Sequence, residues 1–182
     1  MPVTVLIEEF MTISQSILPE FEDEMKKTRA LLERVPEDKF DYTPHAKSMS
    51  LGRLATHVAE LASWAQTTLT TELLEIPGDY KPHLAATREE LLHTFDKGVT
   101  EARSAIQAAS DEDWRKTWTC TYGGQTIISA PRTEVMRGPV LNHLIHHRAQ
   151  LGVYLRLNNV AIPGMYGPSA DEMESFQTQT AA

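Results

Sequence analysis

The stretch NHLIHHRAQLGVYLR, residues 142–156, places three histidines within six residues of an otherwise apolar, helix-forming run. His143 and His147 are four residues apart, and on a helix this spacing puts two side chains on one face, one turn apart. Two imidazoles at that separation can bind the same metal ion. Because Val140 and Leu151 share their face, we expect the pair to point into the protein, where an ion would be shielded from water.

A third ligand has to come from another helix, and His57 is the best candidate. Leu54 precedes it by three residues and Leu61 follows it by four, so His57 is expected on or beside the apolar stripe of its own helix. Two helices could then present three neutral imidazoles to one cation. Three protein ligands leave a coordination position for water or substrate, which is typical of catalytic rather than structural zinc.

Spacing alone leaves a simpler interpretation open for these histidines. A single histidine on an apolar face is usually a core residue hydrogen-bonded to a carbonyl, and pairs four apart also occur by chance. His146 points about 100° away from the pair, so we expect it at the surface or supporting a ligand. His45, His83 and His93 fall in loops or at isolated helical positions and are expected to face solvent.

Three residues near the histidines have two possible roles each. Glu60 could hydrogen-bond a ligand imidazole or a bound water, or it could be a solvated helix residue. Arg148 could pair with an acidic residue or lie at the rim of a pocket. Tyr154 could line a cavity or pack in the core, and Trp118 is expected to attach a hairpin to the helices.

The elements that would position these residues are mainly helices. Helical periodicity covers residues 19–34, 51–69, 87–110 and 133–158, with Ser50 as an N-cap and Thr87 and Glu90 in the positions of a capping box. Between the last two helices, TWTCTYGGQTII (117–128) predicts a two-stranded hairpin that turns at two glycines. The order indicates an all-α fold, a four-helix bundle with long connections and a small β-hairpin between the third and fourth helices.

Composition and charge narrow the function further. A chain of 182 residues fits one domain, 1–182, and its net charge of -8 argues against nucleic acid as a partner. No run reaches the roughly 20 apolar residues that span a bilayer, and the first 16 residues lack the features of a secretory signal, so we expect a cytoplasmic protein. Cys120 is the single cysteine and is expected to be a small buried strand residue.

Three stretches together resemble one known family. HLIHHRAQLGVYLR, the histidine in LGRLATHVAELASWA (51–65) and the closing IPGMYGPSADE (162–172) are similar to the DinB-like (DNA-damage-inducible, YfiT-type) superfamily, and the likeness extends over nearly the whole chain. The resemblance implies a four-helix bundle with long crossovers, often a homodimer, that holds a divalent metal such as zinc or nickel on three histidines. Carried over residue by residue, these are His57, His143 and His147.

The resemblance also implies a class of activity. Characterised relatives include S-transferases and isomerases that use low-molecular-weight thiols such as bacillithiol or mycothiol, so the resemblance implies a small-molecule substrate of this thiol class. A Lewis-acidic metal with an open position can bind a thiol and favour its thiolate. Two alternatives stay open. One is a hydrolase that uses a metal-bound hydroxide, with Glu60 as the candidate base, and the other is a non-catalytic stress-response module whose metal joins two helices.

Overall fold

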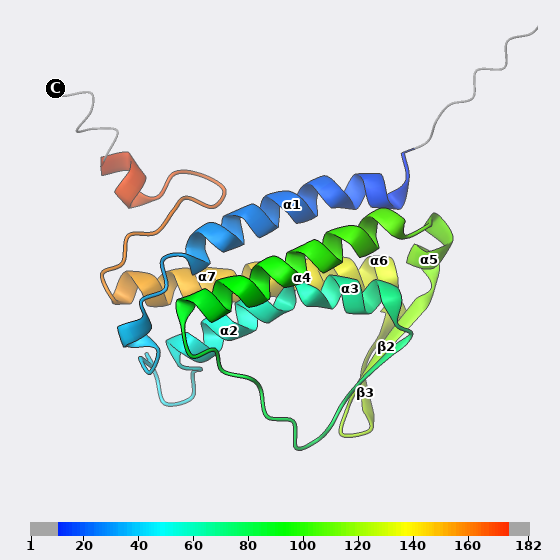
Figure 1. Ribbon diagram of the computed structural model, residues 1–182, viewed down its shortest axis with the longest axis horizontal. Coiled ribbons are helices and arrows are strands. Elements are labelled where there is room, and N and C mark those ends of the chain that lie inside the picture. The colour runs from blue at the N-terminus through cyan, green and yellow to red at the C-terminus, as the bar shows by residue number, and fades with distance from the viewer. Residues whose placement is uncertain (1–10, 175–182) are drawn as a thin grey trace, which may run out of the picture.

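Helices form most of the computed structural model, which describes residues 11–174, and a small sheet lies at one end of them (Figure 1). The α-helices are α1 (Ile13–Leu32), α2 (Leu51–Leu61), α3 (Ser63–Thr70), α4 (Arg88–Ala108), α5 (Asp111–Arg115), α6 (Arg132–Val135) and α7 (His143–Leu157). A 3-10 helix, η1 (Glu37–Lys39), follows α1, and a π-helix, η2 (Met136–Asn142), joins α6 to α7. The strands are β1 (Leu73–Ile76), β2 (Thr117–Tyr122) and β3 (Gln125–Pro131). The prediction of a mostly helical fold is confirmed.

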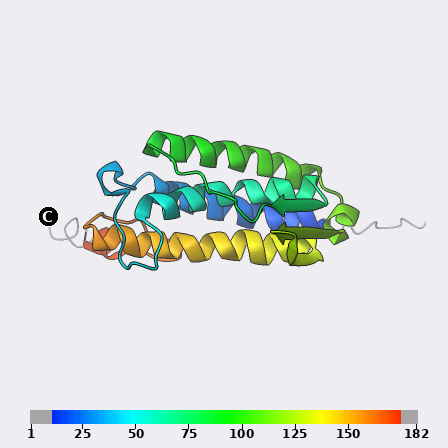
Figure 2. The ribbon, with the colours of Figure 1, turned by 90° about the horizontal axis from the view of Figure 1, so that it is seen from below.

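The long helices run alongside one another. In both views α1, α4, the α2–α3 pair and the continuous α6–η2–α7 segment extend along the same long axis (Figures 1 and 2). The described part of the chain has no helix long and apolar enough to cross a membrane. The first ten residues, which bear on the expected absence of a secretory signal, lie outside the described range.

The first helix begins earlier than the sequence pattern predicts. Thr12 caps it by accepting a hydrogen bond from Gln15 N, while the Gln15 side chain accepts one from Thr12 N. Pro19, predicted as the start of the helix, therefore lies inside it. A proline inside a helix removes one backbone donor, and the reciprocal cap at Thr12 supplies hydrogen bonds about two turns before it.

The caps predicted for the next two long helices are present, with one correction. Ser50 Oγ accepts from Arg53 N at 3.3 Å, and Thr87 Oγ1 accepts from Glu90 N at 3.1 Å. The Glu90 carboxylate, however, accepts from Ala86 N at 2.7 Å and not from Thr87 N, so the predicted capping box is incomplete.

The second helix, predicted as one piece, is divided at Ala62 into α2 and α3. The Ser63 hydroxyl donates to Glu60 O at 2.7 Å, which is the kind of local bond through which serine competes with helical pairing. Gly98 of α4 lies directly against the break. A Cβ at Gly98 would lie 3.1 Å from Ser63 N, so the glycine allows the close approach of α4 to α3.

The sheet has three strands and not the two predicted. β2 and β3 form the expected antiparallel hairpin, with Gly123 and Gly124 at φ of 55° and 80° in its turn. β1 then pairs parallel to β2, with Leu74 opposite Cys120, and it was missed because it is only four residues long and finds its partner far along the chain. Trp118 Nε1 donates to Thr71 Oγ1 at 3.1 Å, which ties the sheet to the end of α3 as expected.

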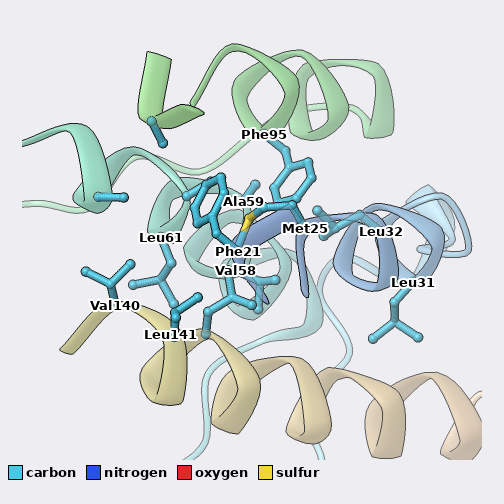
Figure 3. Close-up of a cluster of buried hydrophobic side chains, with 14 of the residues drawn as sticks. Phe21, Met25, Leu31, Leu32, Val58, Ala59, Leu61, Phe95, Val140 and Leu141 are labelled. Carbon is cyan, nitrogen blue, oxygen red and sulfur yellow. The ribbon is translucent and has the colours of Figure 1, made fainter. Parts of the chain in front are cut away.

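The apolar stripes read from the sequence meet in one core. Phe21, Met25 and Leu32 of α1 face Val58 of α2 and Phe95 of α4 (Figure 3). All eight positions predicted on the second helical stripe are buried: Leu51, Leu54, Ala55, Val58, Leu61, Ala62, Ala65 and Leu69. The stripe leaves His57 at the border between this core and the side of the helix that reaches solvent.

Candidate metal centre

Three imidazoles from two helices converge at one point. His57 of α2 and His143 at the start of α7 bring their Nε2 atoms to 3.3 Å. The ring of His147 lies 4.6 Å from that of His57 and 4.7 Å from that of His143, measured between centroids. One nitrogen from each ring can be chosen so that all three lie within 4.8 Å of one another. The structure thus assembles the three predicted residues, while their role as metal ligands stays a prediction.

Burial keeps these rings neutral. The pKa of His57 falls from its usual value to about 3, first because burial penalises the imidazolium form and then because His147, His143 and Arg53 repel a positive charge. Burial also lowers the pKa of His143 and of His147. At neutral pH all three therefore carry a lone pair, the form in which imidazole binds metal.

The π-helix η2 orients the ring of His143. Pro139 lies inside this segment and has no backbone N–H, which disturbs the regular helical ladder. The backbone N–H of His143 bonds to Gly138 O and Val140 O, and the carbonyl of Pro139 lies 3.2 Å from Nδ1 of the same ring. With Nδ1 donating to that carbonyl, Nε2 is the unprotonated nitrogen and points to the cluster. The fourth helix was predicted without this change in type, because periodicity does not reveal a single π turn.

The ring of His147 is oriented by a side chain and not by a backbone carbonyl. Its Nδ1 lies 2.8 Å from Gln150 Oε1, a bond between neighbours three apart on α7. As at His143, an occupied Nδ1 leaves Nε2 as the lone-pair nitrogen. Sequence reasoning did not assign Gln150 a role, although its spacing from His147 on one helix face could have indicated it.

One distance within the cluster matches the ligand separation of a tetrahedral divalent ion. Two ligands of zinc with bonds of about 2.0–2.1 Å lie about 3.3–3.4 Å apart. The 3.3 Å between Nε2 of His57 and Nε2 of His143 has this length. The simpler interpretation is a direct bond, with His57 Nε2–H donating to His143 Nε2. It accounts for two rings, but within residues 11–174 it gives Nε2 of His147 no hydrogen-bond partner.

A cavity of about 440 Å³ opens beside the cluster. His57 and His143 form part of its wall, and α2 and α3 add Arg53, Glu60 and Trp64. The end of β1, the loop after it and the tip of β2 also line the cavity: Leu74, Glu75, Ile76, Pro77, Tyr80 and Tyr122. The strand missed by sequence reasoning therefore supplies part of the cavity wall.

The supporting residues separate into two groups. Glu60 lines the cavity, has Arg53 as its side-chain partner at 3.5 Å, and has a pKa raised mainly by burial. Arg148 and Tyr154 do not line this cavity. Arg148 forms a buried ion pair with Glu24 at 2.6 Å, and the Tyr154 hydroxyl donates to Met49 O.

The remaining four histidines are exposed and are not part of the three-imidazole cluster. His146 is exposed on α7, and its ring meets His147 edge-on with centroids 4.9 Å apart. His45, His83 and His93 are exposed as predicted, and His83 pairs with Glu90 Oε1 at 2.7 Å. Cys120 is fully buried in β2, where burial raises the pKa of its thiol, so it is a packed residue and not an activated nucleophile.

Comparison with known proteins identifies the family of this chain. The family model described as the DinB family matches residues 1–180. The chain belongs to the DinB family. An uncharacterised relative, YrdA of Bacillus subtilis, is 24% identical over 172 residues, which cover 92% of this chain and 95% of the relative.

Solved DinB-like structures share the fold. A Bacillus cereus protein superposes with a TM-score of 0.66 at 21% identity, covering 86% of this chain and 99% of its own. YjoA of Bacillus subtilis gives 0.63 at 16% identity, covering 82% and 96%. A DinB-family member from Exiguobacterium sibiricum gives 0.56 at 21% identity, covering 82% and 95%. At these identities the likeness establishes the fold, and the chemistry has to be argued from the site.

Proposed function

We propose that this DinB-family protein holds a divalent metal ion, zinc or nickel, on His57, His143 and His147 in a four-helix bundle, and acts as a thiol S-transferase. The observation that carries the proposal is the combination of neutral rings, two of them with occupied Nδ1 atoms, and a cavity of about 440 Å³ at their side. A metal ion that only joined the two helices would require the three rings but would not require a cavity beside them. A cavity of this size suits a small organic molecule.

The chain itself supplies binding and orientation. An ion on the three rings would contribute Lewis acidity, which favours the thiolate form of a bound thiol. Pro139 O and Gln150 Oε1 hold two rings in position through their Nδ1 atoms. Trp64 and Ile76 give the cavity apolar walls, which keep a reacting thiol and its electrophile away from bulk water.

Hydrolysis is a second candidate, because one observation favours it. Glu60 lies in the same cavity wall as His57, and burial raises the pKa of its carboxyl group toward the range useful for a general base. In that reaction Glu60 would accept a proton from an attacking water. Its pairing with Arg53 opposes the role, so we place thiol transfer first.

Metal content and two activity assays test the proposal. We expect about one equivalent of divalent metal in the purified protein, lost on His57→Ala, His143→Ala or His147→Ala, and retained on His146→Ala, the exposed neighbour that serves as the matched control. The loaded protein should conjugate a small thiol to an electrophile such as 1-chloro-2,4-dinitrobenzene. Equal metal in the His57→Ala and wild-type proteins would refute the site, and turnover of esters or amides without thiol transfer would favour hydrolysis.

A further inference from the structure

We infer that Arg53 is the anion-recognising residue of this cavity, and that the ligand is a small acid whose carboxylate lies about one helical turn from the group that binds at the histidines. The inference rests on the proposed function, because it specifies the ligand class of the same site. It assigns to the substrate a second anchor besides the metal.

Arg53 lies close to the histidine cluster, on the same helix as His57. Arg53, His57 and Glu60 are spaced by four and three residues along α2, so they lie on one face, and all three line the cavity. Side chains four apart on a helix have Cβ atoms about 5–6 Å apart. The positive charge of Arg53 is close enough to lower the pKa of both His57 and His147. A molecule in the cavity that reaches the imidazoles is therefore also within reach of the guanidinium.

The charge of Arg53 is incompletely paired. A guanidinium has five N–H donors, and among residues 11–174 the one hydrogen-bond acceptor for this group is Glu60 Oε2, at 3.5 Å. Arg148, by comparison, donates to three acceptors between 2.9 and 3.2 Å and contacts a carboxylate at 2.6 Å. The side chain of Arg53 is 23% exposed, and its free donors are available to a ligand.

An ordinary ion pair with Glu60 does not account for this arrangement. A strong pair would lower the pKa of the carboxyl group, whereas the pKa of Glu60 is raised, because burial outweighs the attraction of Arg53. A single contact at 3.5 Å between partly exposed groups stabilises a protein little. An incoming carboxylate could instead form two parallel bonds with the guanidinium fork, which is the stronger geometry.

The other lining residues indicate the chemical character of the rest of the ligand. Trp64, Leu74 and Ile76 present apolar surface, and Tyr80 and Tyr122 add two aromatic rings with polar tips. Such a wall suits a short hydrocarbon or aromatic body. The complete ligand class is an organic acid with a thiol, or another metal-binding donor, a few bonds from its carboxylate.

Two thiols that differ in one group test the inference. Binding of 3-mercaptopropionate and of 3-mercaptopropionamide is measured by calorimetry, on the protein loaded with zinc and on the metal-free protein. We expect the loaded wild type to bind the acid about tenfold to a hundredfold more tightly than the amide, as befits a charge-assisted bidentate contact. Arg53→Met should abolish the preference and Arg53→Lys should keep part of it, both with unchanged metal content.

Two further variants separate recognition from a structural role. Glu60→Gln should increase the preference for the acid, because it removes the competing carboxylate, whereas a purely structural pair would predict no gain. Arg103→Met, which breaks an exposed pair with Glu22, is the matched control and should leave the preference intact. Equal binding of acid and amide, no binding of either, or a preference that survives Arg53→Met would overturn the inference. The metal content of the purified protein tests the proposed metal site independently of this inference. If that site fails, the preference for the acid over the amide is measured on the metal-free protein.

Discussion

Replacing Arg148 with methionine should destabilise the protein far more than a surface substitution. The guanidinium, 2% exposed, lies between α1 and α7 next to the candidate ligand His147. It contacts the Glu24 carboxylate at 2.6 Å and donates to Glu24 O at 3.0 Å, to Thr28 Oγ1 at 3.2 Å and to the Tyr166 hydroxyl at 2.9 Å. Methionine keeps most of the apolar stem and removes all of these contacts.

The expected loss in the free energy of unfolding comes from the Glu24 carboxylate, which Arg148→Met leaves buried without its main partner. The Glu24 side chain is 7% exposed, and within the described residues its remaining partners are the Tyr166 hydroxyl at 3.0 Å and Lys27 Nζ at 3.5 Å. Leaving a buried charge without its main partner costs about 3–5 kcal/mol. Because Lys27 compensates in part, we expect about 3 kcal/mol, which for a chain of this length corresponds to a melting temperature lower by roughly 6–12 °C.

Urea denaturation of the metal-free protein at neutral pH measures the change. The double variant Arg148→Met/Glu24→Met should recover most of the loss, because no buried charge is then left unpaired. Arg137→Met is the control, since Arg137 pairs with Glu20 at the surface, and it should cost less than about 1 kcal/mol. A loss for Arg148→Met no larger than that of the control, or a double variant no more stable than the single one, would refute the reasoning.

Two other predictions concern the histidines directly. Gln150→Leu removes the acceptor of His147 Nδ1, so metal affinity measured by competition with a chelator should fall roughly tenfold to a hundredfold, and an unchanged affinity would show that the bond does not orient the ring. The metal-free protein should lose stability as the pH falls from about 6.5 toward 3, because the unfolded chain protonates His57 in that window while the folded protein, with its pKa near 3, does not. Thermal melts of His57→Gln should show a shallower decline than wild type over the same window, and parallel curves would contradict the assignment.

The local sequence pattern was sufficient to predict most of the helices and the three clustered histidines. Apolar residues at helical spacing predicted the long helices and their buried faces, because that spacing follows from the geometry of a helix alone. The same rule placed His143 and His147 on one face and His57 beside a buried stripe, so the sequence indicated which three imidazoles the fold would bring together. Short-range chemistry also located the caps at Ser50 and Thr87.

Tertiary structure decided the features that depend on partners distant in the chain. β1 exists because Leu73–Ile76 pairs with a strand more than 40 residues away, and a four-residue run carries too little pattern to indicate it. The pairing of Arg148 with Glu24 and the opening of the cavity toward Arg53 depend on how the helices pack. Spacing along one helix shows which residues share a face. Which charge is satisfied and which faces a cavity is settled by the neighbours that the folded chain places around it.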